Sequence, residues 1–266
     1  MQTPDKGKRI LSGRMAMALF FFLLVLYLAA MGWYSLRSLR FSPDSMLYID
    51  VAQNLASGHG LSHSYAMTSE LARLPGDTLL PPMLLWGPLY PLSIALAHFC
   101  GLPCWAAALL IPVFFGGVLL YLVFVLMTRL YERETAVLAV AFLAVSNPFR
   151  FVASHAWSET LGMACLLAAF CLLVAPPGKR NALFAGLFLG LAFTARYALL
   201  PGILLGLLCV IERKSLNRSL RNIVFLCAGF ALLALPVMIR NFLLSGNLLG
   251  SERIPSSVGF FTNLHF

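Results

Sequence analysis

The stretch MAMALFFFLLVLYLAAMGWYSL, residues 15–36, is a run of 22 residues without a charged side chain. A helix that crosses the hydrocarbon core of a bilayer needs about 20 mostly apolar residues, so this stretch is long enough to span a membrane. It is too long for the apolar core of a signal peptide, and no small-residue cleavage site follows it. We therefore interpret residues 15–36 as a retained membrane span.

The composition extends this interpretation to the whole chain. Of the 266 residues, 60% are hydrophobic and only 11% are charged. A soluble domain of this size does not bury so much apolar surface, so the sequence predicts an all-α, polytopic membrane protein. The net charge of +9 would suggest nucleic acid in a soluble chain. Here the basic residues lie between apolar runs, where orientation in the bilayer explains them, and we expect no nucleic-acid partner.

About seven apolar runs are predicted to cross the membrane. They are residues 15–36, 105–128, 135–149, 160–175, 182–195, 197–211 and 222–239. A further run, 83–100, is short and broken by two prolines. If it does not cross, most of the 19 basic residues lie on the same side as the N-terminus, whereas most lie on the other side if it does. The positive-inside rule therefore favours a cytoplasmic N-terminus, with 83–100 interfacial or re-entrant.

This topology divides the chain into three parts. They are a cytoplasmic tail (1–14), a transmembrane core (15–243) whose first extracytoplasmic loop covers 37–104, and an extracytoplasmic tail (244–266). The polar segment 150–159 then lies on the same outer side as the first loop. Charged residues that orientation does not explain therefore gather on one face of the membrane.

Within the first loop, SPDSMLYIDVAQNLASGHG, residues 42–60, predicts an amphipathic helix lying on the membrane. Ser42 can cap its N-terminus and Pro43 suits the first helical position, while two glycines end it. At about 100° per residue, one face carries Asp44, Leu47, Tyr48, Val51 and Leu55.

Asp44 is the first candidate for chemistry because the helix dipole favours a carboxylate in the first turn. The alternative is a structural carboxylate that stabilises the helix by up to about 1 kcal/mol. Tyr48, one turn on, could hold Asp44 or could be an interface aromatic. Asp50 lies roughly 120° away around the helix and is interpreted as solvated.

Glu159 and Arg196 are isolated charges at the edges of apolar runs. An acid in this position is costly unless it is paired or faces water, and an arginine there is expected to meet an anion. A carboxylate at a helix N-terminus and a snorkelling arginine are the structural alternatives. Arg240, at the end of the last apolar run, is a weaker candidate for the same kind of anion contact.

The sequence gives little support for a metal site, a nucleotide-binding site or a hydrolase motif. Cys100 and Cys104 either form a disulfide or stay free. No metal-ligand spacing joins the histidines, and no P-loop, GxSxG, HExxH or dinucleotide fingerprint occurs. Two acids and one or two arginines at an outer cavity suit a carboxylate base acting on an anionic lipid-linked substrate, although a transporter could use the same groups.

Five segments, in order, resemble those of the GT-C glycosyltransferases, in the branch that holds protein mannosyltransferases, aminoarabinose transferases and Rgt-type enzymes. They are SPDSMLYIDVAQNLASGHGLS (42–62), PPMLLWGPLYPLSIALAHFCGL (81–102), the Ser-Glu of SHAWSET (154–160), GLFLGLAFTARYALLP (186–201) and PVMIRNFLLSGNLLGSERIPSS (236–257). Each is a weak motif alone. Their common order and predicted side make the resemblance more specific, and it covers nearly the whole chain from residue 15.

The resemblance implies an inverting transfer of a sugar from a polyprenyl-phosphate donor to a lipid, glycan or protein acceptor. The reaction would take place at the outer face of a bacterial inner (plasma) membrane. Asp44 matches the family's first-loop acid, the general base that deprotonates the acceptor. Glu159 matches the second-loop acid, which positions substrate or helps hold a divalent metal. Arg196 matches the basic residue near the carrier phosphate, and Tyr48 and Arg240 are expected to bind substrate.

Two departures from the family pattern qualify this expectation. Ser45 stands where some relatives carry a paired acid, so metal dependence stays open and no metal ligand is assigned. Family members also continue beyond the seven-span core, and we therefore expect the chain to be truncated after it. The alternative function is a non-catalytic membrane protein, either a transporter or an inactive fragment that binds a lipid carrier.

Overall fold

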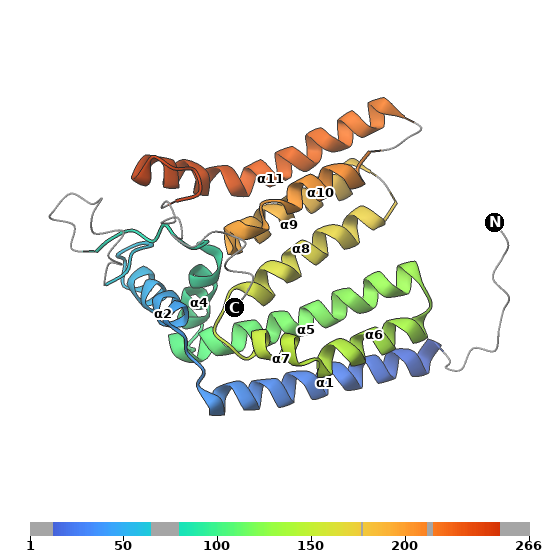
Figure 1. Cartoon of the computed structure of the whole chain (residues 1–266), viewed down its shortest axis with the longest axis horizontal. Helices are drawn as coiled ribbons and strands as arrows, with labels where there is room; N and C mark the ends of the chain where they lie inside the picture. The colour runs from blue at the N-terminus through green and yellow to red at the C-terminus, as the bar shows by residue number, and fades with distance from the viewer. Residues whose placement is uncertain (1–12, 65–79, 177, 212–214, 251–266) are drawn as a thin grey trace, which may run out of the picture.

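A computed structural model describes residues 13–64, 80–176, 178–211 and 215–250 (Figure 1). Across these residues the regular structure is helical, apart from one isolated bridge between Ser62 and Pro82. The predicted all-α class is therefore confirmed for the part of the chain that is described. Much of the predicted tails, residues 1–12 and 251–266, lies outside it.

Three helices are long and apolar enough to cross a membrane: α1 (Gly13–Ser38), α5 (Cys104–Leu130) and α11 (Leu216–Ser245). A fourth span is formed if α6 (Arg133–Val145) and α7 (Asn147–Ala153) cross together, with a bend of 65° between them. The bend falls at Ser146, whose extended backbone (φ −64°, ψ 133°) ends α6, and Pro148 suits the first turn of α7. The described residues thus contain three or four candidate spans.

The remaining bundle helices are shorter. They are α8 (Glu159–Val174), α9 (Lys179–Ala195) and α10 (Gly202–Cys209), with the 3₁₀ turn η1 (Tyr197–Leu199) before α10. At about 1.5 Å per residue, the 16 residues of α8 cover roughly 24 Å, less than the roughly 30 Å of a hydrocarbon core. Seven spans are therefore not confirmed, although α8 and α9 lie alongside α5 and α11 (Figure 1).

The packing of α9 against α11 depends on two glycines. A Cβ atom at Gly186 would lie 2.1 Å from the carbonyl oxygen of Leu226, and one at Gly229 would lie 2.2 Å from that of Leu183. Such contact between backbones is typical of helix pairs in membranes. Large apolar side chains such as Phe142 lie exposed on the outside of the bundle. These features indicate a lipid bilayer environment.

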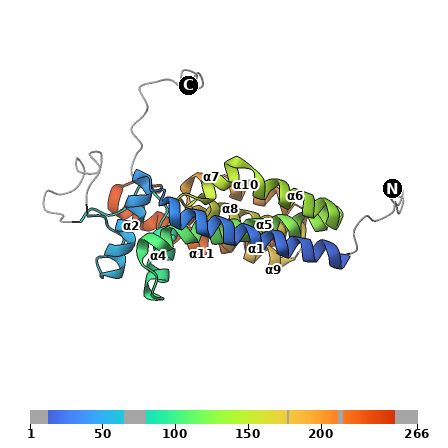
Figure 2. The same ribbon diagram turned by 90° about the horizontal axis from the view of Figure 1, so that it is seen from below.

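Two short helices, α2 (Pro43–Ala56) and α4 (Leu89–Phe99), lie at one end of the bundle in both views (Figures 1 and 2). Tyr90 of α4 donates a hydrogen bond to the carbonyl of Ala108 in α5, 2.6 Å away. Tyr48 of α2 packs edge-on against the Tyr90 ring. With 11 residues, α4 is too short to cross a bilayer, as the sequence predicted for 83–100.

The charged residues divide between the two ends of the bundle. At the end opposite α2, helices begin or stop at basic residues: Arg14, Arg129, Arg133, Lys179, Arg180, Arg218 and Arg221. The same end also carries two acids, Glu132 and Glu134, whereas the α2 end carries three, Asp44, Asp50 and Glu159, and the remaining described arginines. The excess of basic over acidic residues is larger at the end opposite α2 among the described residues, and the membrane orientation stays a prediction.

Candidate functional site

The first turn of α2 begins as its sequence predicts. The hydroxyl of Ser42 accepts a hydrogen bond from the Ser45 backbone at 3.2 Å, and the Ser45 hydroxyl accepts one from the Ser42 backbone at 3.1 Å. Pro43 takes the first helical position. Beyond the helix, Gly58 and Gly60 adopt positive φ angles of 84° and 73°, which side chains disfavour.

The buried face of α2 is centred on Tyr48, which is 2% exposed. Its hydroxyl lies 3.3 Å from the hydroxyl of Ser158. Burial raises the pKa of the Tyr48 phenol, the Ser158 hydrogen bond lowers it, and the charges of Glu159 and Asp44 raise it further. The phenol is therefore protonated at neutral pH and lies within the electrostatic reach of both acids.

The segment before α8 lies across the N-terminus of α2. Trp157 donates its indole N–H to the hydroxyl of Ser42 at 2.8 Å, one residue before the Ser158 contact to Tyr48. These two contacts join regions more than 100 residues apart in sequence. They bring the start of α8, and with it Glu159, to the end of the bundle where Asp44 lies. The sequence did not single out Trp157 or Ser158 as site residues.

Glu159 and Arg196 form an ion pair between α8 and the end of α9, with 2.5 Å between Oε1 and the guanidinium. Arg196 adopts extended backbone (φ −155°, ψ 115°) that stops α9 and turns the chain into η1. Its side chain is 43% exposed and that of Glu159 is 26% exposed. The second oxygen of Glu159, Oε2, is buried and has no hydrogen-bond partner within the described residues. The expected anion beside Arg196 is thus Glu159 itself, while part of the guanidinium stays accessible.

The two acids of α2 have different surroundings. Asp44 is exposed, and its carboxylate makes no hydrogen bond or ion pair to any residue in the described ranges. Asp50 instead accepts hydrogen bonds from the backbone and hydroxyl of Ser64, at 2.7 and 2.8 Å. Asp50 is partly exposed, as its interpretation as solvated expects, but it also fixes the loop that follows α2. Only Asp44 presents an available carboxylate on this helix.

Arg240 serves as a brace between α11 and the α2 end. Its guanidinium donates to the backbone carbonyls of Met83 at 3.0 Å and Leu61 at 3.1 Å. The next residue, Asn241, donates to the hydroxyl of Tyr197 at 3.0 Å. These contacts give Arg240 a structural role, and substrate binding by this residue stays a prediction.

An apolar pocket of about 420 Å³ ends at Glu159. It lies between α5, α7 and α8, with walls that include Leu119, Val123, Phe149, Met163 and Phe170. Glu159 is the one charged residue in its lining. The surface of this pocket is apolar and Arg196 does not line it, so the pocket suits a hydrocarbon chain that lies along the helices near Glu159.

No cluster of three or more histidine, cysteine or acidic side chains that could hold a metal ion occurs within the described ranges. A divalent metal at Glu159 therefore stays a prediction from the family resemblance. Cys100 and Cys104 are both free in the structure.

Comparison with known proteins gives no match: no protein-family model, no curated protein and no solved structure is significantly similar to this chain. The class that the fold defines is a helical membrane protein, and its candidate site joins Asp44, Tyr48, Glu159 and Arg196 at one end of the bundle. The resemblance to GT-C glycosyltransferases rests on the sequence motifs alone.

Proposed function

We propose that the protein is a membrane glycosyltransferase that moves a sugar from a polyprenyl-phosphate donor to an acceptor, with inversion. The observation that carries the proposal is the gathering of Asp44, Tyr48, Glu159 and Arg196 at one end of the bundle. An apolar pocket has Glu159 of this cluster in its lining. A reaction on a lipid-linked sugar needs a base, a cation for the departing phosphate and a site for the lipid chain.

The donor occupies the apolar pocket with its isoprenoid chain, and its phosphate lies against the accessible part of Arg196. A preorganised guanidinium stabilises the charge that develops on the leaving phosphate. Glu159 holds this guanidinium in place through the ion pair. Arg196 is in this proposal a substrate-binding residue, and Glu159 is a positioning residue.

Asp44 acts as the general base. It accepts the proton of an acceptor hydroxyl while the acceptor oxygen attacks the anomeric carbon from the side opposite the phosphate. The bond between the anomeric carbon and the phosphate oxygen breaks, and its electron pair leaves with the polyprenyl phosphate. The exposed position of Asp44 in the first turn of α2 supports this role, because the acceptor has access to it.

The proposal places the α2 end on the outer side of a bacterial inner membrane and the N-terminus in the cytoplasm. The support is the cluster of basic helix ends at the opposite end of the bundle, since cytoplasmic loops are enriched in lysine and arginine. The acceptor and the sugar are left open, because they depend on contacts that the described residues do not define.

The test is the release of polyprenyl phosphate. Purified protein in lipid vesicles is incubated with a set of polyprenyl-phosphate hexoses and pentoses and with cell-envelope lipids as acceptors, and free polyprenyl phosphate is measured by mass spectrometry. We expect release from at least one donor, and a rate at least about tenfold lower for Arg196→Met. Arg37→Gln, at the same end of the bundle, is the matched control and should keep the rate.

If the wild-type protein releases polyprenyl phosphate from no donor, the proposal is contradicted. Binding of the donors without release would then favour the non-catalytic alternative.

A further inference from the structure

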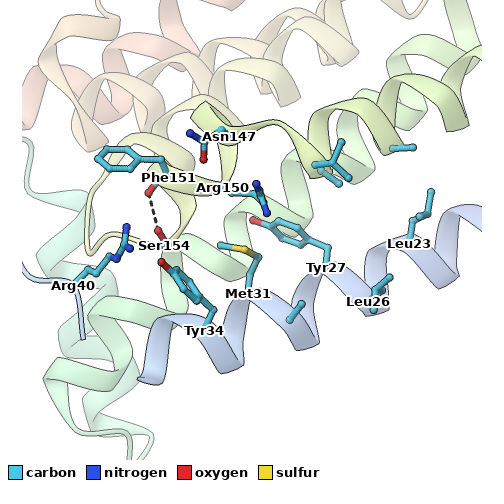
Figure 3. Close-up of a pocket in the computed structure, with 14 residues that line it drawn as sticks. Leu23, Leu26, Tyr27, Met31, Tyr34, Arg40, Asn147, Arg150, Phe151 and Ser154 are labelled. Carbon is cyan, nitrogen blue, oxygen red and sulfur yellow. Dashed lines mark hydrogen bonds between the residues drawn. The ribbon is translucent and has the colours of Figure 1, made fainter. Parts of the chain in front are cut away.

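A second pocket, of about 580 Å³, lies on the other side of α7. Figure 3 shows its walls: α1 contributes Tyr27, Met31 and Tyr34, and α7 contributes Arg150 and Phe151. The two pockets use different faces of α7, because Phe149 and Val152 line the pocket that ends at Glu159. The second pocket is therefore separate from the proposed donor site.

Two arginines line this second pocket, and neither is paired with an acidic side chain of the described residues. Arg150 comes from α7, and Arg40 comes from the short segment between α1 and α2. Neither side chain forms an ion pair with an acid anywhere in the described ranges. The guanidinium of Arg40 lies over the ring of Tyr34, 5.2 Å from its centroid. No acidic residue lines the pocket, so its charge is positive.

The rest of the lining is suited to a hydrocarbon chain. Below the arginines the walls are apolar, with Leu23, Leu26, Ala30, Met31, Ala141 and Ala144. The helices that form these walls, α1 and α6, carry exposed apolar side chains toward the surrounding lipid. A ligand of this pocket thus has an apolar part that enters from the bilayer and an anionic part that meets the two cations.

Tyr27 gives an independent indication of a ligand. It lines the pocket, its side chain is 5% exposed, and its hydroxyl has no hydrogen-bond partner among the described residues. A buried hydroxyl without a partner destabilises a fold, because it has lost its hydrogen bonds to water. The hydroxyl lies against Gly116 of α5, and Figure 3 shows Tyr27 and Arg150 together in the pocket lining. An anionic oxygen bound by Arg150 would also give the phenol an acceptor.

We propose that this pocket binds one anionic lipid of the bilayer, with its headgroup phosphate between Arg40 and Arg150 and part of one chain along α1. Charge complementarity and the apolar wall select this occupant over a soluble anion. Phosphate and guanidinium groups pair through short, charge-assisted hydrogen bonds, which are stronger than neutral ones. The inference goes beyond the proposed function, because lipid binding at this pocket does not require sugar transfer.

Lipid binding to the purified full chain is the test. The probes are a phosphatidylglycerol and a phosphatidylcholine with identical chains, titrated into detergent-solubilised protein and measured by native mass spectrometry. We expect tighter binding of the phosphatidylglycerol, and an affinity about tenfold lower for Arg40→Gln and for Arg150→Gln. Arg37→Gln is the control: Arg37 stacks on Trp33, 4.2 Å from the ring centroid, and does not line the pocket.

A second variant tests the apolar wall without removing a charge. Ala30 is an exposed residue that lines the pocket, and Ala30→Trp should lower the phosphatidylglycerol affinity because the indole fills the space of the chain. Equal binding of the two lipids, or unchanged affinity in both arginine variants, would overturn the proposal. Displacement of the lipid by millimolar inorganic phosphate would also overturn it, since the site would then be one for a soluble anion.

The release of polyprenyl phosphate, measured on the same variants, separates the two proposals. Lost lipid binding with retained release supports a separate lipid site. Retained lipid binding in the arginine variants refutes this inference whatever the release assay gives.

Discussion

The Glu159–Arg196 ion pair predicts unequal effects when either partner is removed. The carboxylate is the more buried partner, with 26% of its side chain exposed against 43% for Arg196. One of its oxygens already has no hydrogen-bond partner in the described part of the chain. Removing the arginine therefore leaves a half-buried charge without compensation, whereas removing the carboxylate leaves a guanidinium that water can reach.

The magnitudes follow from these exposures. We expect Glu159→Gln to lower the free energy of unfolding by less than about 1 kcal/mol, as for solvent-screened ion pairs. Arg196→Met should lower it by about 1–3 kcal/mol, the cost of an unsatisfied polar group that is partly withdrawn from water. The double variant should be more stable than the sum of the two changes predicts, because it removes the charge that Arg196→Met leaves unpaired.

Reversible unfolding of the purified protein by sodium dodecyl sulfate in mixed micelles, followed by circular dichroism, gives the free energies for this double-mutant cycle. An interaction energy within about 0.3 kcal/mol of zero would refute the pairing. A larger loss for Glu159→Gln than for Arg196→Met would contradict the argument from exposure.

Three further predictions concern the elements that position the site. Tyr48→Phe should destabilise the protein by about 1 kcal/mol in the same assay, because it removes the hydrogen bond to Ser158 but keeps the ring packing; an unchanged value would contradict that contact. Gly229→Ala should lower stability by about 1–3 kcal/mol, because its Cβ would meet the Leu183 carbonyl at 2.2 Å. The control Gly32→Ala, where no atom lies within 4 Å, should not lower stability, and equal effects would argue against close α9–α11 packing. Arg240→Met should expose the α2 end to limited proteolysis, since the bonds to Met83 and Leu61 are lost; wild-type resistance would refute the brace.

Local features of the fold could be predicted from the sequence, and distant ones could not. The start of α2 depends on Ser42 and Pro43, whose effects act within one turn. The predicted runs 160–175 and 182–195 match α8 and α9 closely, but apolar composition alone does not show whether runs this short cross the membrane. Extended backbone at Arg196 ends α9 after 17 residues, so the run that surrounds it is divided into short helices.

At the candidate site, too, single residues could be predicted from the sequence but contacts between distant residues could not. Asp44, Glu159 and Arg196 could be singled out because a charge beside an apolar run needs an explanation. Their partners could not be identified, because the Glu159–Arg196 contact joins residues 37 positions apart and depends on how α8 packs against α9. The contacts of Asp50 could not be predicted for the same reason: its partner Ser64 lies in the loop 14 residues later, and helical periodicity does not describe that loop.

The measurement that tests the central claim most directly compares Asp44→Asn with Asp50→Asn in the polyprenyl phosphate release assay. Both substitutions remove one carboxylate from the same helix, but Asp44 is exposed and unbound in the described structure while Asp50 is bound to Ser64. If Asp44 is the general base, Asp44→Asn lowers the release rate by at least about 100-fold at unchanged protein level, and Asp50→Asn keeps most of it. Release by Asp44→Asn at the wild-type rate would contradict the account.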